Sequence, residues 1–340
     1  LFAAQWLGWD IGLTLAWSAP VAGIAQLALL WIAALRAGFK MLPRWPKMTP
    51  ELKRLAMIAA PAALAGGVVQ VNLLVGRQIA SYFEGANAWL YYADRLYQLP
   101  LGVVGVAIGI VLLPDLSRRL RIGDEAGGQE AFNRAAELSL LLTIPCTVAL
   151  IVIPSAIVSV LFERGAFMAS DTQATALATA IYGLGLPAFV LQKLYQPVFF
   201  AREDTRSPFN FALVALVINA LVAIGLSRYV GFTASAIGAT CAGWAMLGCL
   251  WWGARRFGPA ARWDAQLRNR ALRIILASLG MGVIVWMIAW ALESVLQTDG
   301  LRLLGLIVIL LVAVASYILA GRLLGAFSLS ELRQMMRRAD

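Results

Sequence analysis

Long apolar runs separated by short polar connectors dominate this chain up to about residue 324. A helix needs about 20 apolar residues to cross the hydrocarbon core of a bilayer, and these runs are that long or longer. The pattern predicts nine full spans, at residues 11–35, 55–81, 88–116, 135–162, 173–201, 207–228, 231–254, 271–292 and 301–324. We therefore predict an all-α fold, a polytopic bundle of transmembrane helices.

Composition indicates the same class. Apolar residues make up 61% of the chain, charged residues only 14%, and the mean hydropathy is +0.78. The absence of histidine removes the commonest metal ligand and the commonest proton carrier near neutral pH. Cys146, Cys241 and Cys249 lie within apolar runs without CxxC spacing, so we expect packing residues rather than a disulfide or a metal site.

Basic residues gather in alternate connectors. One side of the membrane receives 22 of the 28 lysines and arginines, from segments 36–54, 118–134, 202–206, 255–273 and 322–338. By the positive-inside rule this side is cytoplasmic, so the first complete span runs inward and the C-terminus is cytoplasmic. The net charge of +10 is thus largely a topology signal. We expect no nucleic-acid partner, because such binding would need these charges on one soluble domain.

Three polar or terminal segments have their own interpretation. The chain opens at Leu1 without methionine, basic segment or cleavage signature, so we interpret residues 1–10 as the remnant of a preceding span and outer loop. Residues 36–54, with three prolines, predict a stiff basic linker along the anionic headgroups of membrane lipids. Residues 325–340 would form a cytoplasmic tail.

The intervening connectors receive one basic residue each, Arg77, Arg164, Arg228 and Arg302. Two basic residues are left once the connectors are counted, Arg95 and Lys193, and both fall inside predicted spans. An arginine near the bilayer centre costs about 2.5–3.5 kcal/mol or more, so it normally faces a wet cavity and marks a substrate path. Alternatively, Arg95 snorkels to the outer interface or is neutralised by Asp94, and the long stem of Lys193 reaches the cytoplasmic interface.

The cavity hypothesis has specific chemistry. An arginine offers a bidentate fork and a lysine a point charge, so the two cations on neighbouring spans would suit a phosphate group. The polar residues expected beside them on nearby turns are Tyr92, Gln98 and Gln192. Prolines and glycines in several spans, such as Pro100 and Gly105, permit kinks around such a cavity, although ordinary small-residue packing explains them as well.

Three segments resemble the MurJ/MviN family, bacterial flippases of lipid II within the multidrug/oligosaccharidyl-lipid/polysaccharide exporter superfamily. They are WLYYADRLYQLPLGVVGVAIGIVLLPDLSR at residues 89–118, LFERGAF followed by DTQAT at 161–175, and YGLGLPAFVLQKLYQPVFFAREDTRSP at 182–208. Their order and spacing are similar to those of the family. The likeness covers essentially the whole chain, as the family's portion from the sixth span to the fourteenth.

The resemblance implies export of lipid II, the undecaprenyl-pyrophosphate-linked disaccharide pentapeptide, to the outer leaflet of the bacterial inner membrane for peptidoglycan synthesis. It implies an alternating-access transporter and not an enzyme, without a cofactor and coupled to the membrane potential or to a monovalent cation. Residues 11–35 would link two lobes, 55–254 would form the second, C-terminal lobe of six spans, and 271–324 two extra spans with a groove for the lipid tail. The chain would then be a fragment lacking the N-terminal lobe as its partner.

For individual residues, the resemblance implies that Arg95, in the family's YADR motif, is a required charge of a cationic central cavity, with Asp94 as its local partner. Two departures bear on ion coupling. Gln98 stands where some members carry an acidic residue. Span 55–81 offers only Gln70 and Asn72 before its outer end, which counts against a sodium site.

Two alternatives stay open. An exporter of drugs or of another lipid-linked oligosaccharide would share the architecture. An integral-membrane polyprenyl-phosphate transferase or phosphatase would need clustered carboxylates for metal or general-base chemistry. The compact acidic groups are Glu203 with Asp204 and Asp124 with Glu125, each flanked by basic residues, and we expect them to balance charge at helix ends.

Overall fold

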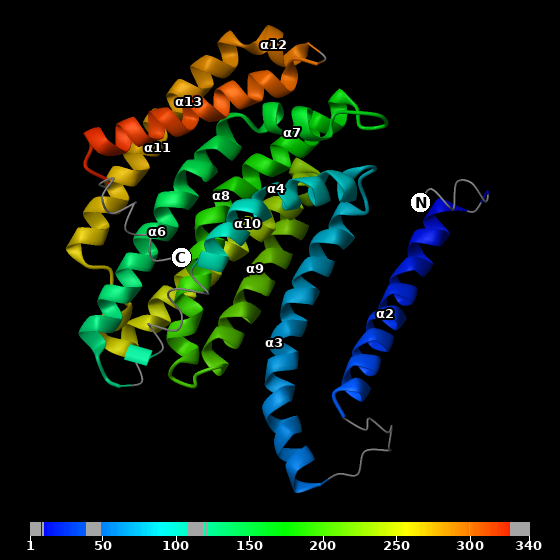
Figure 1. Cartoon of the computed structure of the whole chain (residues 1–340), viewed down its shortest axis with the longest axis vertical. Helices are drawn as coiled ribbons and strands as arrows, with labels where there is room; N and C mark the ends of the chain where they lie inside the picture. The colour runs from blue at the N-terminus through cyan, green and yellow to red at the C-terminus, as the bar shows by residue number, and fades with distance from the viewer. Residues whose placement is uncertain are drawn as a thin grey trace. The chain divides into compact units, whose positions relative to one another are not determined.

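Helices make up the regular structure of this protein (Figure 1). The computed structural model describes residues 8, 10–38, 49–107, 118–119, 122–298 and 300–326, and no β-strand occurs among them. The predicted all-α class is confirmed.

The helices follow the predicted spans closely. They are α2 (Ile11–Arg36), α3 (Pro50–Ala80), α4 (Ala86–Ala107), α6 (Glu125–Val152), α7 (Pro154–Phe162), α8 (Ala169–Phe200), α9 (Arg206–Val230), α10 (Thr233–Ala254), the 3₁₀ segment η2 (Arg255–Ala261), α11 (Ala265–Ala291), α12 (Glu293–Gln297) and α13 (Arg302–Leu323). Within the described residues, seven helices are long and apolar enough to cross a membrane: α2, α6, α8, α9, α10, α11 and α13. The helices α3 and α4 are not among them, so the count of nine spans is not confirmed.

Several predicted boundaries differ from the structure, and prolines account for two of the differences. The predicted span 135–162 consists of α6 and α7, which break at Ile153 because Pro154 cannot continue the hydrogen-bond ladder and instead opens α7 at its first position. The helix α3 begins at Pro50, inside the predicted linker 36–54, where proline is again accepted in the first turn. Residues 108–116 of the predicted span 88–116 lie outside the described residues, as do residues 39–48 of the linker.

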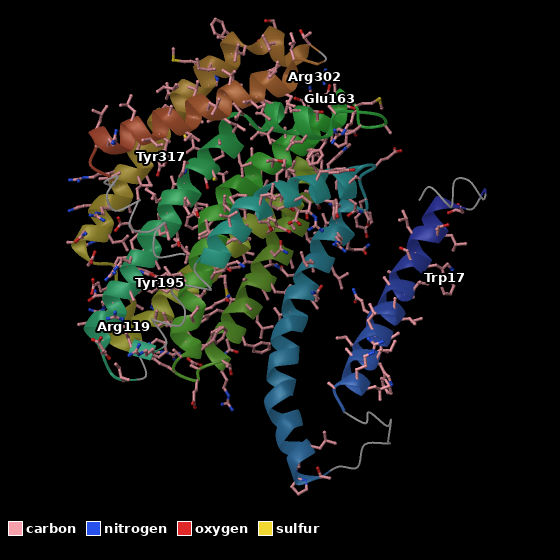
Figure 2. The ribbon with its side chains drawn as sticks, viewed as in Figure 1. Trp17, Arg119, Glu163, Tyr195, Arg302 and Tyr317 are labelled. Carbon is pink, nitrogen blue, oxygen red and sulfur yellow. The ribbon has the colours of Figure 1, made fainter. Side chains whose placement is uncertain are left out.

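The chain divides into two compact units, residues 1–60 and residues 61–340. In the first unit, Asp10 caps α2 by accepting a hydrogen bond from the Leu13 backbone N–H at 2.8 Å. Apolar side chains are exposed around the helix, including Trp17 (Figure 2). A helix that is apolar on all sides suits a lipid environment.

The core of the second unit surrounds α8, which packs against α4, α6, α7 and α10. Its Leu194, Tyr195 and Phe199 side chains are at most 1% exposed, and the Tyr195 ring lies 4.9 Å from that of Phe132 on α6, centroid to centroid. Lipid tails are as apolar as leucine, so close packing rather than exclusion of water holds such helices together. Tyr195 is labelled in Figure 2.

The helices α11 and α13 pack against α6. Gly282 of α11 permits the closest approach: a β-carbon there would stand 2.5 Å from Val148 of α6. The Tyr317 hydroxyl of α13 donates to the Leu141 carbonyl of α6 at 2.8 Å. These contacts attach α11 and α13 to α6.

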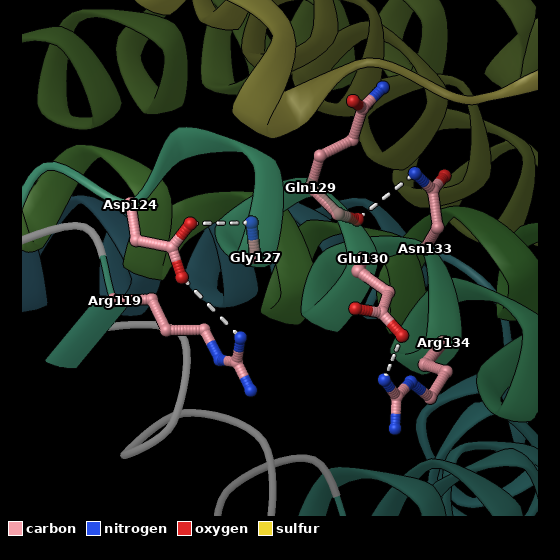
Figure 3. A network of polar contacts seen from close by, with 7 residues as sticks. All are labelled: Arg119, Asp124, Gly127, Gln129, Glu130, Asn133 and Arg134. Atoms are coloured by element: carbon pink, nitrogen blue, oxygen red, sulfur yellow. Dashed lines mark hydrogen bonds and ion pairs between the residues drawn. The ribbon is translucent and has the colours of Figure 1, made fainter.

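The first turn of α6 carries a polar network (Figure 3). Asp124 caps the helix by accepting a hydrogen bond from the Gly127 backbone N–H at 2.9 Å, and it lies 3.5 Å from Arg119. Glu130 and Arg134 pair one turn later. Acidic groups at a helix N-terminus stabilise the helix by satisfying its free N–H groups and its dipole.

Candidate functional site

The candidate residues of α4 lie within two helical turns. Gln98 connects them: its amide N–H donates to the Asp94 carboxylate, and its carbonyl oxygen accepts from Arg95 Nη1 at 3.4 Å. Spacings of three and four residues place these side chains on neighbouring turns of the helix. Asp94 is therefore engaged by Gln98 rather than by a close ion pair with Arg95.

The Arg95 guanidinium is exposed and retains most of its donors. Its central carbon lies 4.8 Å from the centroid of the Tyr91 ring, a cation–π arrangement. Among the described residues, no carboxylate forms an ion pair with Arg95, and its one hydrogen bond goes to an uncharged amide. An exposed arginine with this geometry can still bind an anion through two parallel N–H groups.

Lys193 is exposed on α8 and lies against α4. A β-carbon at Gly105 of α4 would stand 3.4 Å from Lys193 Cδ and 3.7 Å from Nζ. Gly105 is ten residues beyond Arg95, which corresponds to roughly 15 Å of helix rise. The structure therefore places the two cations beside one helix, α4, at different levels, and does not bring them into a single cluster.

The other two candidate residues have packing partners. Gln192 donates to the Gly243 carbonyl of α10 at 2.7 Å, which joins two helices. The ring centroid of Tyr92 lies 4.7 Å from that of Phe162 and 5.3 Å from that of Phe167. Gln192 thus serves the α8–α10 contact, and Tyr92 belongs to an aromatic cluster at the start of α4.

A pocket of about 640 Å³ with both apolar and polar lining residues lies among α3, α4, α8, α9 and α10. Asp94 of α4 and Arg77 of α3 both line it, with Tyr92, Asn72 and Asn219. Sequence reasoning assigned Arg77 to a connector, although it lies four residues before the predicted end of span 55–81. The signal that would have found it is its place inside the apolar run, on the helix preceding the YADR motif.

Side-chain hydrogen bonds join α3 to α9 and α10 beside this pocket. Asn219, only 2% exposed, donates through Nδ2 to Asn72 Oδ1 at 2.5 Å. The Ser235 hydroxyl donates to the Gly76 carbonyl at 3.1 Å. Gln70 is exposed and does not line the pocket. Within the described ranges, no group of three or more His, Cys, Asp or Glu residues is placed to hold a metal ion.

Comparisons with known proteins agree on one family. The family model described as "Lipid II flippase MurJ" matches residues 1–324. The protein described as "Probable lipid II flippase MurJ" of Rhizobium tropici is 41% identical over 346 residues, which cover 99% of this chain and 64% of the relative. The protein of the same description from Rhizobium meliloti (strain 1021) is also 41% identical, over 96% of this chain and 62% of the relative.

A solved structure shares the fold. "Lipid II flippase MurJ, inward closed conformation" superposes with a TM-score of 0.70 at 23% identity, over 87% of this chain and 59% of that one. At this identity the likeness concerns the fold alone. The chain spans less than two thirds of the length of the relatives described above.

Proposed function

The chain belongs to the lipid II flippase MurJ family, and on that premise we propose that it acts in moving lipid II across the bacterial inner membrane. The substrate is the undecaprenyl-pyrophosphate-linked disaccharide pentapeptide, carried from the inner to the outer leaflet by alternating access. The supporting observation is Arg95, an exposed guanidinium on α4 whose one hydrogen bond within the described part of the chain goes to the neutral Gln98 amide. A pyrophosphate is the anion that its free donors fit best.

The arrangement on α4 explains why Arg95 stays available. Gln98 donates to Asp94, so the carboxylate has a partner other than Arg95. The Tyr91 ring faces the guanidinium and steadies it without consuming an N–H donor. In a site with little water, each remaining N–H bond to phosphate is stronger than it would be in bulk solvent.

Lys193 extends this path toward the cytoplasm. With the C-terminus and the basic connectors on the cytoplasmic side, α4 enters from the outer side and Gly105 lies deeper than Arg95. Lys193, which contacts Gly105, would attract the pyrophosphate first, and Arg95 would bind it closer to the outer side. The driving force is the membrane potential or a monovalent cation, with no resident cofactor.

The acidic groups support transport over enzymatic chemistry on polyprenyl phosphates. Asp204 pairs with Arg256 and accepts a hydrogen bond from the Ser207 backbone N–H at 3.0 Å. Asp124 pairs with Arg119 and caps α6. A metal-dependent transferase or phosphatase needs free clustered carboxylates, and these two have structural partners.

The test is a flipping assay in proteoliposomes with two substrates, lipid II and a lipid-linked oligosaccharide that lacks the peptide. We expect the protein to move lipid II across the bilayer and to move the second lipid much more slowly. Equal rates for the two lipids would favour a broader oligosaccharide exporter. Chemical conversion of either lipid, detected by mass spectrometry, would favour an enzyme.

A further inference from the structure

The pocket of Arg77 and Asp94 adjoins the proposed pyrophosphate site, because Tyr91, whose ring faces Arg95, also lines it. Arg77 and Asp94 line it from α3 and α4, whereas Arg95 does not. Its volume of about 640 Å³ lies within the range of roughly 300–1,000 Å³ that is typical of small-molecule sites. Arg77 and Asn87 are exposed at its α3–α4 side, so a ligand has access from there.

The charges of this pocket disfavour a phosphate. Arg77 contributes one positive charge and Asp94 one negative charge, close enough for Arg77 to act electrostatically on Asp94. The formal charges of the lining therefore cancel. A pyrophosphate placed here would gain attraction from Arg77 and lose it again to repulsion from Asp94.

The remaining lining residues suit an uncharged, hydroxylated group. The side-chain amide of Asn87 offers both donors and acceptors. The Asn72 amide, whose oxygen accepts from Asn219, adds N–H donors, and the Ser235 hydroxyl, which donates to Gly76, adds an acceptor. The rings of Tyr91 and Tyr182 supply flat apolar surfaces with a polar tip. Mixed donors and acceptors beside aromatic faces match the alternating hydroxyl and C–H surfaces of a sugar.

We propose that this pocket binds the carbohydrate part of the lipid-linked substrate, with Arg77 and Asn87 as specificity-determining residues. The inference rests on the proposed function. Arg95 recognises the pyrophosphate common to all polyprenyl-pyrophosphate lipids, and the Arg77 pocket distinguishes a lipid that carries sugars from one that does not. A change at Arg95 therefore weakens binding of the pyrophosphate, and a change at Arg77 or Asn87 weakens binding of the sugars.

The experiment measures the binding of two lipids to the purified protein in detergent by native mass spectrometry: undecaprenyl pyrophosphate and the same lipid carrying the disaccharide. In Arg77→Gln and in Asn87→Ala, we expect affinity for the disaccharide lipid to fall about tenfold, the value of one or two lost hydrogen bonds to a charged or amide group. Affinity for undecaprenyl pyrophosphate should stay within about twofold. Arg95→Ala is the matched control and should weaken both lipids alike.

The outcomes separate the two hypotheses. If the wild-type protein binds neither lipid, the proposed function fails and this inference fails with it. If the wild type binds both, but Asn87→Ala has no effect or weakens both lipids equally, the carbohydrate pocket is wrong and the flippase assignment stands. Asn87 is exposed in the first turn of α4, so this variant carries the test even where Arg77→Gln does not fold.

Discussion

Arg302 of α13 donates from Nη1 to Glu163 Oε1 at 3.0 Å, across 139 residues of sequence (Figure 2). The two side chains are 22% and 20% exposed. The second carboxylate oxygen of Glu163 accepts a hydrogen bond from the Thr172 hydroxyl at 2.7 Å. The Glu163 carboxylate, which follows α7, thus connects α13 with the first turn of α8.

This pair predicts a loss of stability when its charge is removed. Glu163→Gln should lower the free energy of unfolding by about 1–3 kcal/mol, because the Arg302–Glu163 ion pair and its charge-assisted hydrogen bond are lost from a partly buried position. Thermal unfolding of the detergent-solubilised protein measures the change. Arg164→Ala is the neighbouring control: Arg164 is exposed and donates to the Leu161 carbonyl, so its loss should have little effect. Equal changes in both variants would contradict the role of the pair.

Arg95 should be required for transport and not for folding. Arg95→Ala should reduce lipid II transport by at least about 100-fold, because a desolvated charge–phosphate contact is worth about 3–5 kcal/mol. Arg95→Lys should retain part of the rate, since the charge stays but the bidentate fork is lost. Growth of a flippase-depleted strain that expresses either variant measures the remaining transport. Arg228→Ala, at another exposed arginine, is the control. Normal growth of Arg95→Ala would refute the site.

The positive charge of Lys193 should increase the rate of lipid II transport. Lys193→Gln should slow transport by about two- to fivefold, the value of a partly screened charge, and Lys193→Glu should abolish it by placing an anion on the path. Substituted-cysteine accessibility, with the native cysteines replaced, should show position 193 facing water. Position 184 on the same helix is the control, because Leu184 is 52% exposed and apolar and should face lipid. Equal protection of both positions would place Lys193 outside the path.

Asp204 should make stability depend on acid pH. Burial alone would raise the pKa of the Asp204 carboxyl. Hydrogen bonds from Ser207 and the positive charge of Arg256 outweigh burial, so the pKa lies below its usual value. A depressed carboxylate pKa stabilises the fold above the unfolded-state pKa of about 3.9, and that stability is lost as the pH falls through the folded-state pKa. Asp204→Asn should therefore lower the Tm at pH 7, and this effect should begin to decline near pH 4 and disappear as the pH falls through the folded-state pKa. Glu203→Gln, at an exposed neighbour, is the control.

The helices were predictable from the sequence because a long apolar run inside a bilayer is stable mainly as a helix. Backbone groups in hydrocarbon must be satisfied within the segment, so the run predicted at 301–324 forms a helix over Arg302–Leu323. The break between α6 and α7 also follows from the local sequence, since Pro154 lacks the N–H that a continuous helix would need there. Family membership followed from segments that stand in order along the chain.

Side-chain partners could not be obtained in this way. Gln192 was expected beside Lys193 in a cavity, yet the packing of α8 against α10 makes the Gly243 carbonyl its partner, 51 residues along the chain. Arg77 was counted with a connector, yet the turn between α3 and α4 brings it to the same pocket as Asp94. Apolar periodicity and charge along the chain determine which segments are helices and which residues are costly in lipid. Helix packing alone decides which polar groups meet, because hydrogen bonds and charge contacts act over a few ångströms between residues that the sequence separates widely.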